Sequence, residues 1–278
     1  MSNKGTAIAQ LTAKKEAGEK IAVVTAYDYT MAVLADQAGM DLLLVGDSLG
    51  MVFAGYQSTM PVTMNDMLYH TQIVSRAAQR AIVVADMPYG SYHISPERAI
   101  ENALLLVKKG GADAVKIECT SALLPTIKNL VDAGIPVMGH LGLLPQTAAL
   151  WGGYRVQGKD EAAVMSIVDL AVDIEEAGAF SLVLECLTSE AAKVITANVD
   201  IPTIGIGAGN ACDGQVLVSH DLLGYTQGHV PKFVKKYADI GAEIGRAYKE
   251  YIDDVKSGNF PGEQYAFEMD KHEARKLP

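Results

Sequence analysis

Acidic, basic and histidine side chains stand at the ends of five successive β-rich segments of the chain. They are Asp47 after residues 42–45, Asp86 after 81–85, Lys116 and Glu118 at the end of 114–117, His140 after 136–139 and Glu185 after 181–184. If these segments are parallel strands of one barrel, their carboxyl ends meet around a single mouth. Each residue alone has an ordinary explanation, such as a turn cap or a structural ion pair, but the set predicts one shared site.

The spacing of two residues within the fourth segment sharpens this prediction. Side chains two apart on a strand share a face, so Lys116 and Glu118 point together while Ile117 and Cys119 point away. A buried ion pair costs desolvation energy, so a strand with a merely structural role would favour apolar residues there. By the same alternation Cys186 points away from the mouth, which disfavours zinc.

Asp47, Asp86 and Glu118 are candidate metal ligands, and carboxylates offer only oxygen ligands. These three residues therefore suit Mg²⁺ or a similar hard cation. A cation held by carboxylates can chelate a 2-oxo acid through its carbonyl and carboxylate, which acidifies the neighbouring C–H. These residues predict enolate chemistry on a 2-oxo acid, although residue types do not identify the electrophile that the enolate meets.

The remaining side chains can supply the other parts of such a reaction. Lys116 would place positive charge near the substrate oxygens and stabilise an enolate. Glu185 is the candidate base, because Glu118 is better used near the metal. His140 could hydrogen-bond the substrate or a departing group.

The elements that must position these residues alternate regularly along the chain. Short β-rich runs are expected at 21–26, 42–45, 81–85, 114–117, 136–139, 181–184, 203–206 and 216–218. Helical periodicity is expected at 28–38, 64–79, 96–109, 121–133, 161–177, 188–197 and 232–256. Eight strands alternating with helices predict a (β/α)₈ TIM barrel. A doubly wound open sheet is the alternative, but it needs a glycine-rich loop after the first strand, where residues 26–29 read AYDY.

We expect one barrel domain over residues 1–278, with an N-terminal segment 1–20 and a C-terminal tail 257–278 as extensions. No glycine- or serine-rich linker divides the chain. Two connections, 46–63 and 140–160, are unusually long and follow strands. They should therefore lie on the face of the barrel where active sites are built.

Composition excludes several classes of partner. The net charge of -10 and the pI of about 5.1 argue against nucleic acid and anionic membranes as ligands. Cys119, Cys186 and Cys212 match neither a zinc motif nor a disulfide framework, so a reducing compartment is expected. The first residues carry charges where a signal peptide needs an apolar core, and no apolar run reaches roughly 18 residues. We expect a soluble cytoplasmic protein.

Six short motifs occur in order along the chain. They are 45–51 (VGDSLGM), 115–118 (VKIE), 139–143 (GHLGL), 152–154 (GGY), 184–186 (LEC) and 205–210 (GIGAGN). In these motifs the chain resembles the ketopantoate hydroxymethyltransferase family, and the likeness runs from about residue 25 to 263. The family usually has two glycines where Cys119 and Thr120 stand here, and segment 87–92 matches more loosely, which leaves the folate pocket undefined.

The resemblance implies a (β/α)₈ barrel that holds one Mg²⁺ per subunit. The family adds the one-carbon unit of 5,10-methylenetetrahydrofolate to 3-methyl-2-oxobutanoate and forms 2-dehydropantoate, a precursor of pantothenate and coenzyme A. Its members are homo-oligomers, often decamers.

The resemblance also implies a role for each site residue. The implied metal ligands are Asp47, Asp86 and Glu118. The implied substrate contacts are Asp47, Ser48, Asp86 and Lys116. Glu185 is the implied proton acceptor, and His140 matches an active-site position.

Two other functions are compatible with the strand-end residues. Another Mg²⁺-dependent enolate-forming lyase or mutase on a TIM barrel would call for several arginines or a better phosphate loop, whereas the strand ends offer one lysine and no arginine. The glycines of 205–209 lack the full phosphate-binding fingerprint and are better explained by close packing in a tight turn. A non-catalytic metal-binding scaffold predicts loss of the base, yet Glu185 is present.

Overall fold

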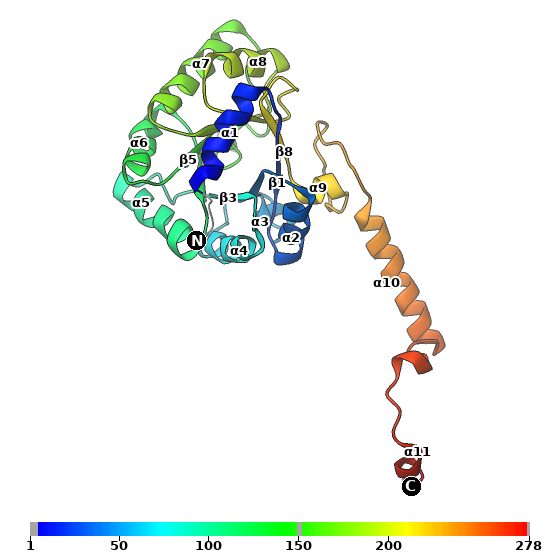
Figure 1. Ribbon diagram of the computed structural model, residues 1–278. Coiled ribbons are helices and arrows are strands. Elements are labelled where there is room, and N and C mark those ends of the chain that lie inside the picture. Colours follow the sequence, from blue (N-terminus) through cyan, green and yellow to red (C-terminus); the bar gives the residue numbers. More distant parts are fainter. Residues whose placement is uncertain (1–4, 149–151, 277–278) are drawn as a thin grey trace. The chain divides into compact units, whose positions relative to one another are not determined.

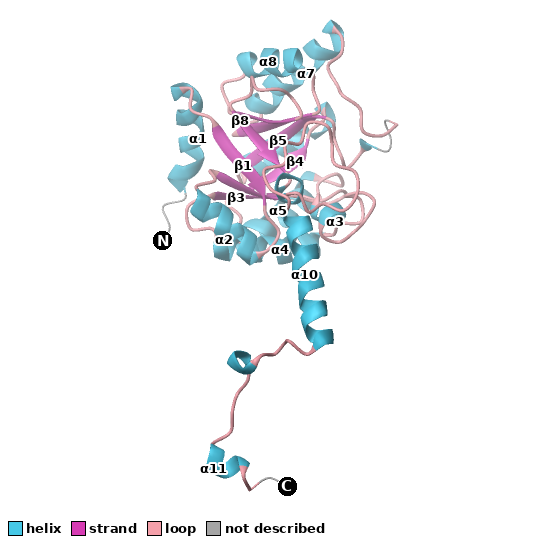
Figure 2. Cartoon of the chain, turned by 90° about the vertical axis from the view of Figure 1, so that its right-hand side faces the viewer, coloured by secondary structure: helices cyan, strands magenta, loops and turns pink. Residues whose placement is uncertain are grey.

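Eight parallel strands close into a barrel in chain order. A computed structural model describes residues 5–148 and 152–276. The strands are β1 (Ile21–Thr25), β2 (Leu42–Val45), β3 (Ile82–Asp86), β4 (Ala114–Glu118), β5 (Val137–Gly142), β6 (Ser181–Glu185), β7 (Thr203–Ile206) and β8 (Gly214–Leu217). β8 pairs with both β7 and β1, which closes the sheet. The predicted (β/α)₈ barrel is confirmed, with its strands drawn in magenta in Figure 2.

Helices surround the barrel (Figure 1). Between the strands lie α2 (Tyr29–Ala38), α3 (Leu49–Val52), α4 (Met64–Ala77), α5 (Pro96–Leu104) with a π-helical turn (Leu105–Lys109), a 3₁₀ turn (Ser121–Leu123) with α6 (Leu124–Asp132), α7 (Glu161–Glu176) and α8 (Ser189–Asn198). Before β1 the chain forms α1 (Gly5–Ala17). After β8 it forms α9 (Ser219–Leu223), α10 (Ile240–Ser257), a 3₁₀ turn (Glu263–Tyr265) and α11 (Lys271–Ala274). No described helix is both long and apolar enough to cross a membrane.

Polar capping residues fix where these helices begin. The Asp28 and Asp160 side chains accept hydrogen bonds from the first turns of α2 and α7. Thr63 and Asp66 form a reciprocal capping box at the start of α4. Ser95 caps α5 ahead of a proline in its first turn, as the sequence predicts.

An apolar layer inside the barrel forms the floor of its mouth. Val84, Ala114, Met138 and Val183 belong to one buried cluster. Two residues further along each strand, on the same face, come Asp86, Lys116, His140 and Glu185, respectively. The strand registers place Asp86 beside Lys116 and Glu118 beside His140. The alternation inferred from the sequence therefore holds, and the polar side chains lie directly above this layer.

The helix α1 differs from the sequence analysis, which predicts residues 1–20 only as an N-terminal extension. Its Leu11 is buried in the cluster inside the barrel. Its Lys15 donates hydrogen bonds to the carbonyl oxygens of Thr196, Val199 and Ile201, before β7. These contacts hold α1 across the amino ends of the strands (Figure 1). The low amphipathicity of this segment gives little helical signal in the sequence.

The expected helix 232–256 is shorter than predicted. It begins only at Ile240, after Asp239, and residues 232–239 are not helical. The Phe233 ring packs so closely on Gly207 that a Cβ atom there would lie 2.6 Å from it. This tertiary contact outweighs the local helical preference of the segment.

The chain divides into two compact units. One comprises the chain up to Ser219 together with Val230–Val234, and it contains the whole barrel. The other comprises His220–His229 and the chain from Lys235 onward, including α10. The expected domain bounds, 1–278 with extensions 1–20 and 257–278, remain a prediction.

Candidate functional site

The barrel brings the predicted strand-end residues together at its mouth. Asp47, Asp86, Lys116, Glu118 and His140 are all buried, although each is polar or charged. Burying so many ionisable groups is costly unless they pair with one another or with a ligand. Their burial marks this cluster as the candidate functional site.

Lys116 is the cation of the cluster. Its Nζ atom forms an ion pair with Asp86 Oδ1 at 2.9 Å and lies 3.4 Å from His140 Nδ1. Burial alone would lower the pKa of Lys116, but attraction by Asp86 and Asp47 outweighs it and raises that pKa above its usual value. Lys116 is therefore a permanent ammonium group at neutral pH.

The position of Lys116 fixes the tautomer of His140. Burial, together with the charge of Lys116, holds the pKa of His140 well below its usual value, so the imidazole is neutral. An ammonium group can only donate, so His140 Nδ1 must accept and the proton lies on Nε2. His140 Nε2 is 3.1 Å from Glu185 Oε2. The N–H is not aligned with this oxygen, since Nε2 makes no hydrogen bond by angle, and a small rotation of either side chain would complete the bond.

Glu185 has the properties of a general base. Burial raises its pKa to about 7, and the charge of Lys116 opposes this rise. A carboxyl group with a pKa near neutrality accepts a proton more readily than an ordinary glutamate and is still largely ionised at physiological pH. The chain from Asp86 through Lys116 and His140 to Glu185 is therefore one electrostatically coupled unit.

The backbone around Glu185 is unusually constrained. Gly142 has φ +93°, and a Cβ atom there would lie 2.2 Å from the Glu185 carbonyl oxygen. Cys186 adopts a left-handed conformation, with φ +49°, which is rare for a residue other than glycine. The Leu143 N–H donates to the Glu185 carbonyl and the Gln157 N–H to that of Cys186. The 143–160 connection is thus hydrogen-bonded near both of its ends to the backbone of Glu185 and Cys186.

The three predicted metal ligands are joined through hydrogen bonds. The Asp47 backbone N–H donates to Asp86 Oδ2 at 3.0 Å. Gln146 donates from Nε2 to Asp47 Oδ2 at 2.8 Å, and from its backbone N–H to Glu118 Oε1 at 2.9 Å. Burial and mutual repulsion raise the pKa of Asp47 to about 7 and that of Glu118 to about 9.

The donor set fits a hard cation. Among residues 5–148 and 152–276, no three acidic, histidine or cysteine side chains already converge as metal ligands. However, Glu118 Oε2 is buried without a hydrogen-bond partner, and Asp86 Oδ1 accepts no aligned hydrogen bond beside its ion pair with Lys116. The raised pKa values of Asp47 and Glu118 mean that these groups retain protons near neutral pH, and an oxygen-binding cation would displace those protons and stabilise the carboxylates. The assignment of these carboxylates as ligands stays a prediction.

Sequence reasoning missed several uncharged residues of the site. Gln146 donates to the Asp47 and Glu118 carboxylates. The Tyr92 hydroxyl donates to Gln146 Oε1 and accepts from the Glu118 backbone N–H, and the Tyr27 hydroxyl lies 2.8 Å from Ser48 Oγ. Their residue types give no signal, because glutamine and tyrosine are common in loops and cores. The only indication was that Gln146 falls in the long 140–160 connection, on the face where a site was expected.

The glycine-rich loop after β7 serves packing. Phe233 fills the space beside Gly207, and Ser189 fills that beside Gly209, where a Cβ atom would lie 2.6 Å from its hydroxyl oxygen. A phosphate would need this space. The prediction of close packing at 205–209 is therefore confirmed.

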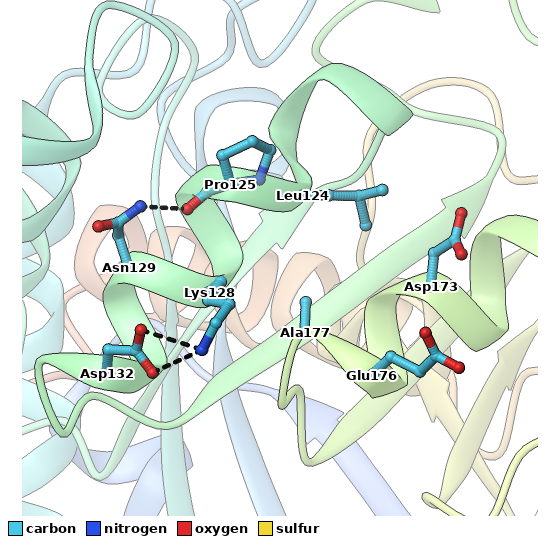
Figure 3. Close-up of a pocket in the computed structure, with 8 residues that line it drawn as sticks. All are labelled: Leu124, Pro125, Lys128, Asn129, Asp132, Asp173, Glu176 and Ala177. Atoms are coloured by element: carbon cyan, nitrogen blue, oxygen red, sulfur yellow. Dashed lines mark hydrogen bonds and ion pairs between the residues drawn. The ribbon is translucent and has the colours of Figure 1, made fainter.

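A surface groove between α6 and α7 is separate from the mouth. It has a volume of about 610 Å³ and is lined by helix residues, among them Lys128, Asp132 and Asp173 (Figure 3). None of the strand-end residues lines it, and Lys128 is already paired with Asp132. It is not a candidate active site.

Solved structures share this fold at low sequence identity. A phosphonopyruvate hydrolase matches with a TM-score of 0.62 and 13% identity, covering 96% of this chain and 93% of that one. A 2,3-dimethylmalate lyase of the PEP mutase/isocitrate lyase superfamily matches with a TM-score of 0.59 and 18% identity, covering 97% and 93%. These likenesses establish the fold alone, which the alternative lyase or mutase function would share.

Sequence relatives distinguish between the hydroxymethyltransferase function and the alternative lyase or mutase function. A relative from Moorella thermoacetica, named 3-methyl-2-oxobutanoate hydroxymethyltransferase, is 55% identical over 93% of this chain and 96% of its own length. A relative of the same name from Syntrophus aciditrophicus is 54% identical over 91% and 93%. A family model described as Ketopantoate hydroxymethyltransferase matches residues 5–263. By both measures, this chain belongs to the ketopantoate hydroxymethyltransferase family.

Proposed function

We propose that this protein transfers a one-carbon unit from 5,10-methylenetetrahydrofolate to 3-methyl-2-oxobutanoate through an enolate, giving 2-dehydropantoate for pantothenate and coenzyme A synthesis. The family match and its named relatives support the reaction class. The observation that carries the mechanism is the succession of buried Asp86, Lys116 and His140 that ends at the partly buried Glu185. It places a base of near-neutral pKa and a permanent cation at one mouth.

Glu185 would begin the reaction by removing the proton from C3 of the 2-oxo acid. The C–H electron pair moves into the C2–C3 bond while the carbonyl π pair moves to oxygen, giving the enolate. Lys116 stabilises the negative charge that develops on the substrate oxygens. Water would add to the methylene carbon of the folate, whose bonds to the two folate nitrogens break as those nitrogens take the protons of water, releasing formaldehyde and tetrahydrofolate. The enolate carbon would then bond to the formaldehyde carbon, and the resulting alkoxide would take the proton held by Glu185 to give the hydroxymethyl group.

His140 would hold the base ready between turnovers. The Nε2–H of His140 lies beside the Glu185 carboxylate. Because the imidazole is neutral, it does not carry the additional proton that it would need to act as an acid toward the substrate. When Glu185 takes the substrate proton, its carboxylate becomes neutral. This protonation costs little free energy because the pKa of Glu185 is already near 7. His140 thus acts on the base rather than as an acid in its own right.

Asp47, Asp86 and Glu118 would hold one Mg²⁺ per subunit, which would polarise the carbonyl of the bound 2-oxo acid. The buried, unpartnered Glu118 Oε2 supports this assignment. Asp47, Ser48, Asp86 and Lys116 would contact the substrate. Ser48 is held for this role by its hydrogen bond with Tyr27.

We also propose that the protein is a cytoplasmic homo-oligomer, and by family resemblance a decamer. Apolar and aromatic side chains of α10 support self-association. They are exposed and recur at helical spacing: Ile240, Ile244, Tyr248, Tyr251, Ile252 and Val255. An exposed row of this kind normally marks an interaction surface.

The first prediction concerns the electrophile. With 3-methyl-2-oxobutanoate and Mg²⁺, we expect 2-dehydropantoate to form only when methylenetetrahydrofolate is added, as measured by mass spectrometry of the products. Controls receive oxaloacetate or 2,3-dimethylmalate without folate. Cleavage of either dicarboxylate at a comparable rate would instead favour the lyase alternative.

The second prediction concerns the base. Glu185→Gln keeps the shape of the side chain but removes the proton acceptor, so deuterium exchange at C3 in D₂O should fall by about 10²- to 10⁴-fold. Proton NMR of the 2-oxo acid measures this rate. The matched control is Glu176→Gln, an exposed position on α7, which should exchange normally. Exchange by Glu185→Gln at the parent rate, with Mg²⁺ bound, would remove Glu185 from its assigned role.

The third prediction concerns assembly. Light scattering of the purified full chain should give about ten times the chain mass of 29.6 kDa. Tyr248→Asp places a charge within the exposed row of α10 and should reduce this mass. Tyr69→Asp, at an exposed position on α4, serves as the control. A parent mass of one chain would contradict self-association.

A further inference from the structure

Gln146 connects more parts of the mouth than any residue singled out from the sequence. Its Nε2 donates to Asp47 Oδ2 at 2.8 Å and to the Met87 carbonyl at 3.0 Å. Its Oε1 accepts from the Tyr92 hydroxyl at 2.6 Å, and its backbone N–H donates to Glu118 Oε1 at 2.9 Å. These partners follow β2 and β3 or, for Glu118, end β4, whereas Gln146 itself follows β5.

The burial of Gln146 shows that this arrangement is specific. Only 3% of the residue is exposed, and its amide is satisfied on both sides. An amide buried without such partners would cost about 1–3 kcal/mol. All four hydrogen bonds are made to residues outside the connection that carries Gln146.

The contacts act on two carboxylates in the same way. Asp47 and Glu118 are each held by one oxygen, and the second oxygen of Glu118 is buried without a partner. A neutral amide orients a carboxylate without cancelling its charge, unlike a lysine or an arginine. A carboxylate held in this way keeps its attraction for a cation and loses less conformational entropy when the cation binds.

We propose that Gln146 is a positioning residue for the cation site, holding Asp47 and Glu118 in place so that a free oxygen of each can bind a divalent cation. This inference rests on the proposed Mg²⁺ site. Tyr92 supports the arrangement, because its hydroxyl accepts from the Glu118 N–H at 3.2 Å while donating to Gln146. The 143–160 connection thereby forms part of the metal site without supplying a ligand.

The test is isothermal titration of Mg²⁺ alone into the metal-free full-length protein. Gln146→Met keeps the length of the side chain and the backbone N–H but removes the amide, so Mg²⁺ affinity should fall by about 10- to 100-fold. Tyr92→Phe, which removes one partner of that amide, should weaken binding in the same direction but less. The matched control is Gln157→Met in the same connection, where the side-chain amide donates to the Arg155 carbonyl and, within the described residues, bonds no carboxylate of the site. It should bind like the parent.

Two further measurements separate the outcomes. Asp86→Ala removes a proposed ligand and should abolish binding, and urea unfolding of each metal-free variant reports its folding. If Gln146→Met is folded and binds Mg²⁺ like the parent, the amide has only a packing role and the inference is overturned, while the Mg²⁺ proposal stands. If the parent itself binds no Mg²⁺, both are overturned. If Gln146→Met unfolds, the Tyr92→Phe titration decides, and parent-like affinity there overturns the inference.

Discussion

The interaction on which the site depends is the attraction between buried Lys116 and the carboxylates around it. Asp47, Asp86, Glu118 and Glu185 all influence one another or Lys116 electrostatically, so the mouth holds more acidic groups than it has cations. Burial, reinforced by repulsion between the acidic groups, raises the pKa of Asp47 and Glu118, and a further cation would relieve both effects. The charge of Lys116 limits the rise at Glu185 and keeps it near neutrality. Burial of acidic groups beside a single lysine thus underlies both the proposed metal site and the proposed base.

The barrel makes this imbalance tolerable. Strand alternation places Asp86, Lys116 and Glu185 above apolar residues of the interior layer, namely Val84, Ala114 and Val183, respectively. That layer excludes water from below, while backbone and side-chain donors hold the carboxylates from the sides. The same fold carries hydrolases, mutases and lyases among its structural neighbours. At the strand ends of this chain, a neutral histidine lies between Lys116 and Glu185.

Much of this organisation could be predicted from the sequence, because it follows from local periodicity. All eight strands lie within a few residues of their expected positions, and alternation along β4 correctly placed Lys116 and Glu118 on one face, as their shared burial with Asp86 and His140 shows. Gln146 could not be predicted, since its role depends on contacts with three other strand ends. The predicted helix over residues 232–239 is wrong for a similar reason. The packing of Phe233 on Gly207 is a long-range contact, which local periodicity does not reveal. The domain bounds and the metal ligands stay predictions.

The most direct test of the central claim is the pH dependence of C3 proton exchange, measured in D₂O buffers with saturating Mg²⁺ and no folate. Only the ionised Glu185 carboxylate can accept the proton, so protonation below its pKa of about 7 removes the base. We predict that the exchange rate rises about tenfold per pH unit at low pH and levels off above about pH 7. A rate that is already constant from about pH 5 upward would show that Glu185 has an ordinary pKa, and would contradict the account of a base tuned by burial beside Lys116.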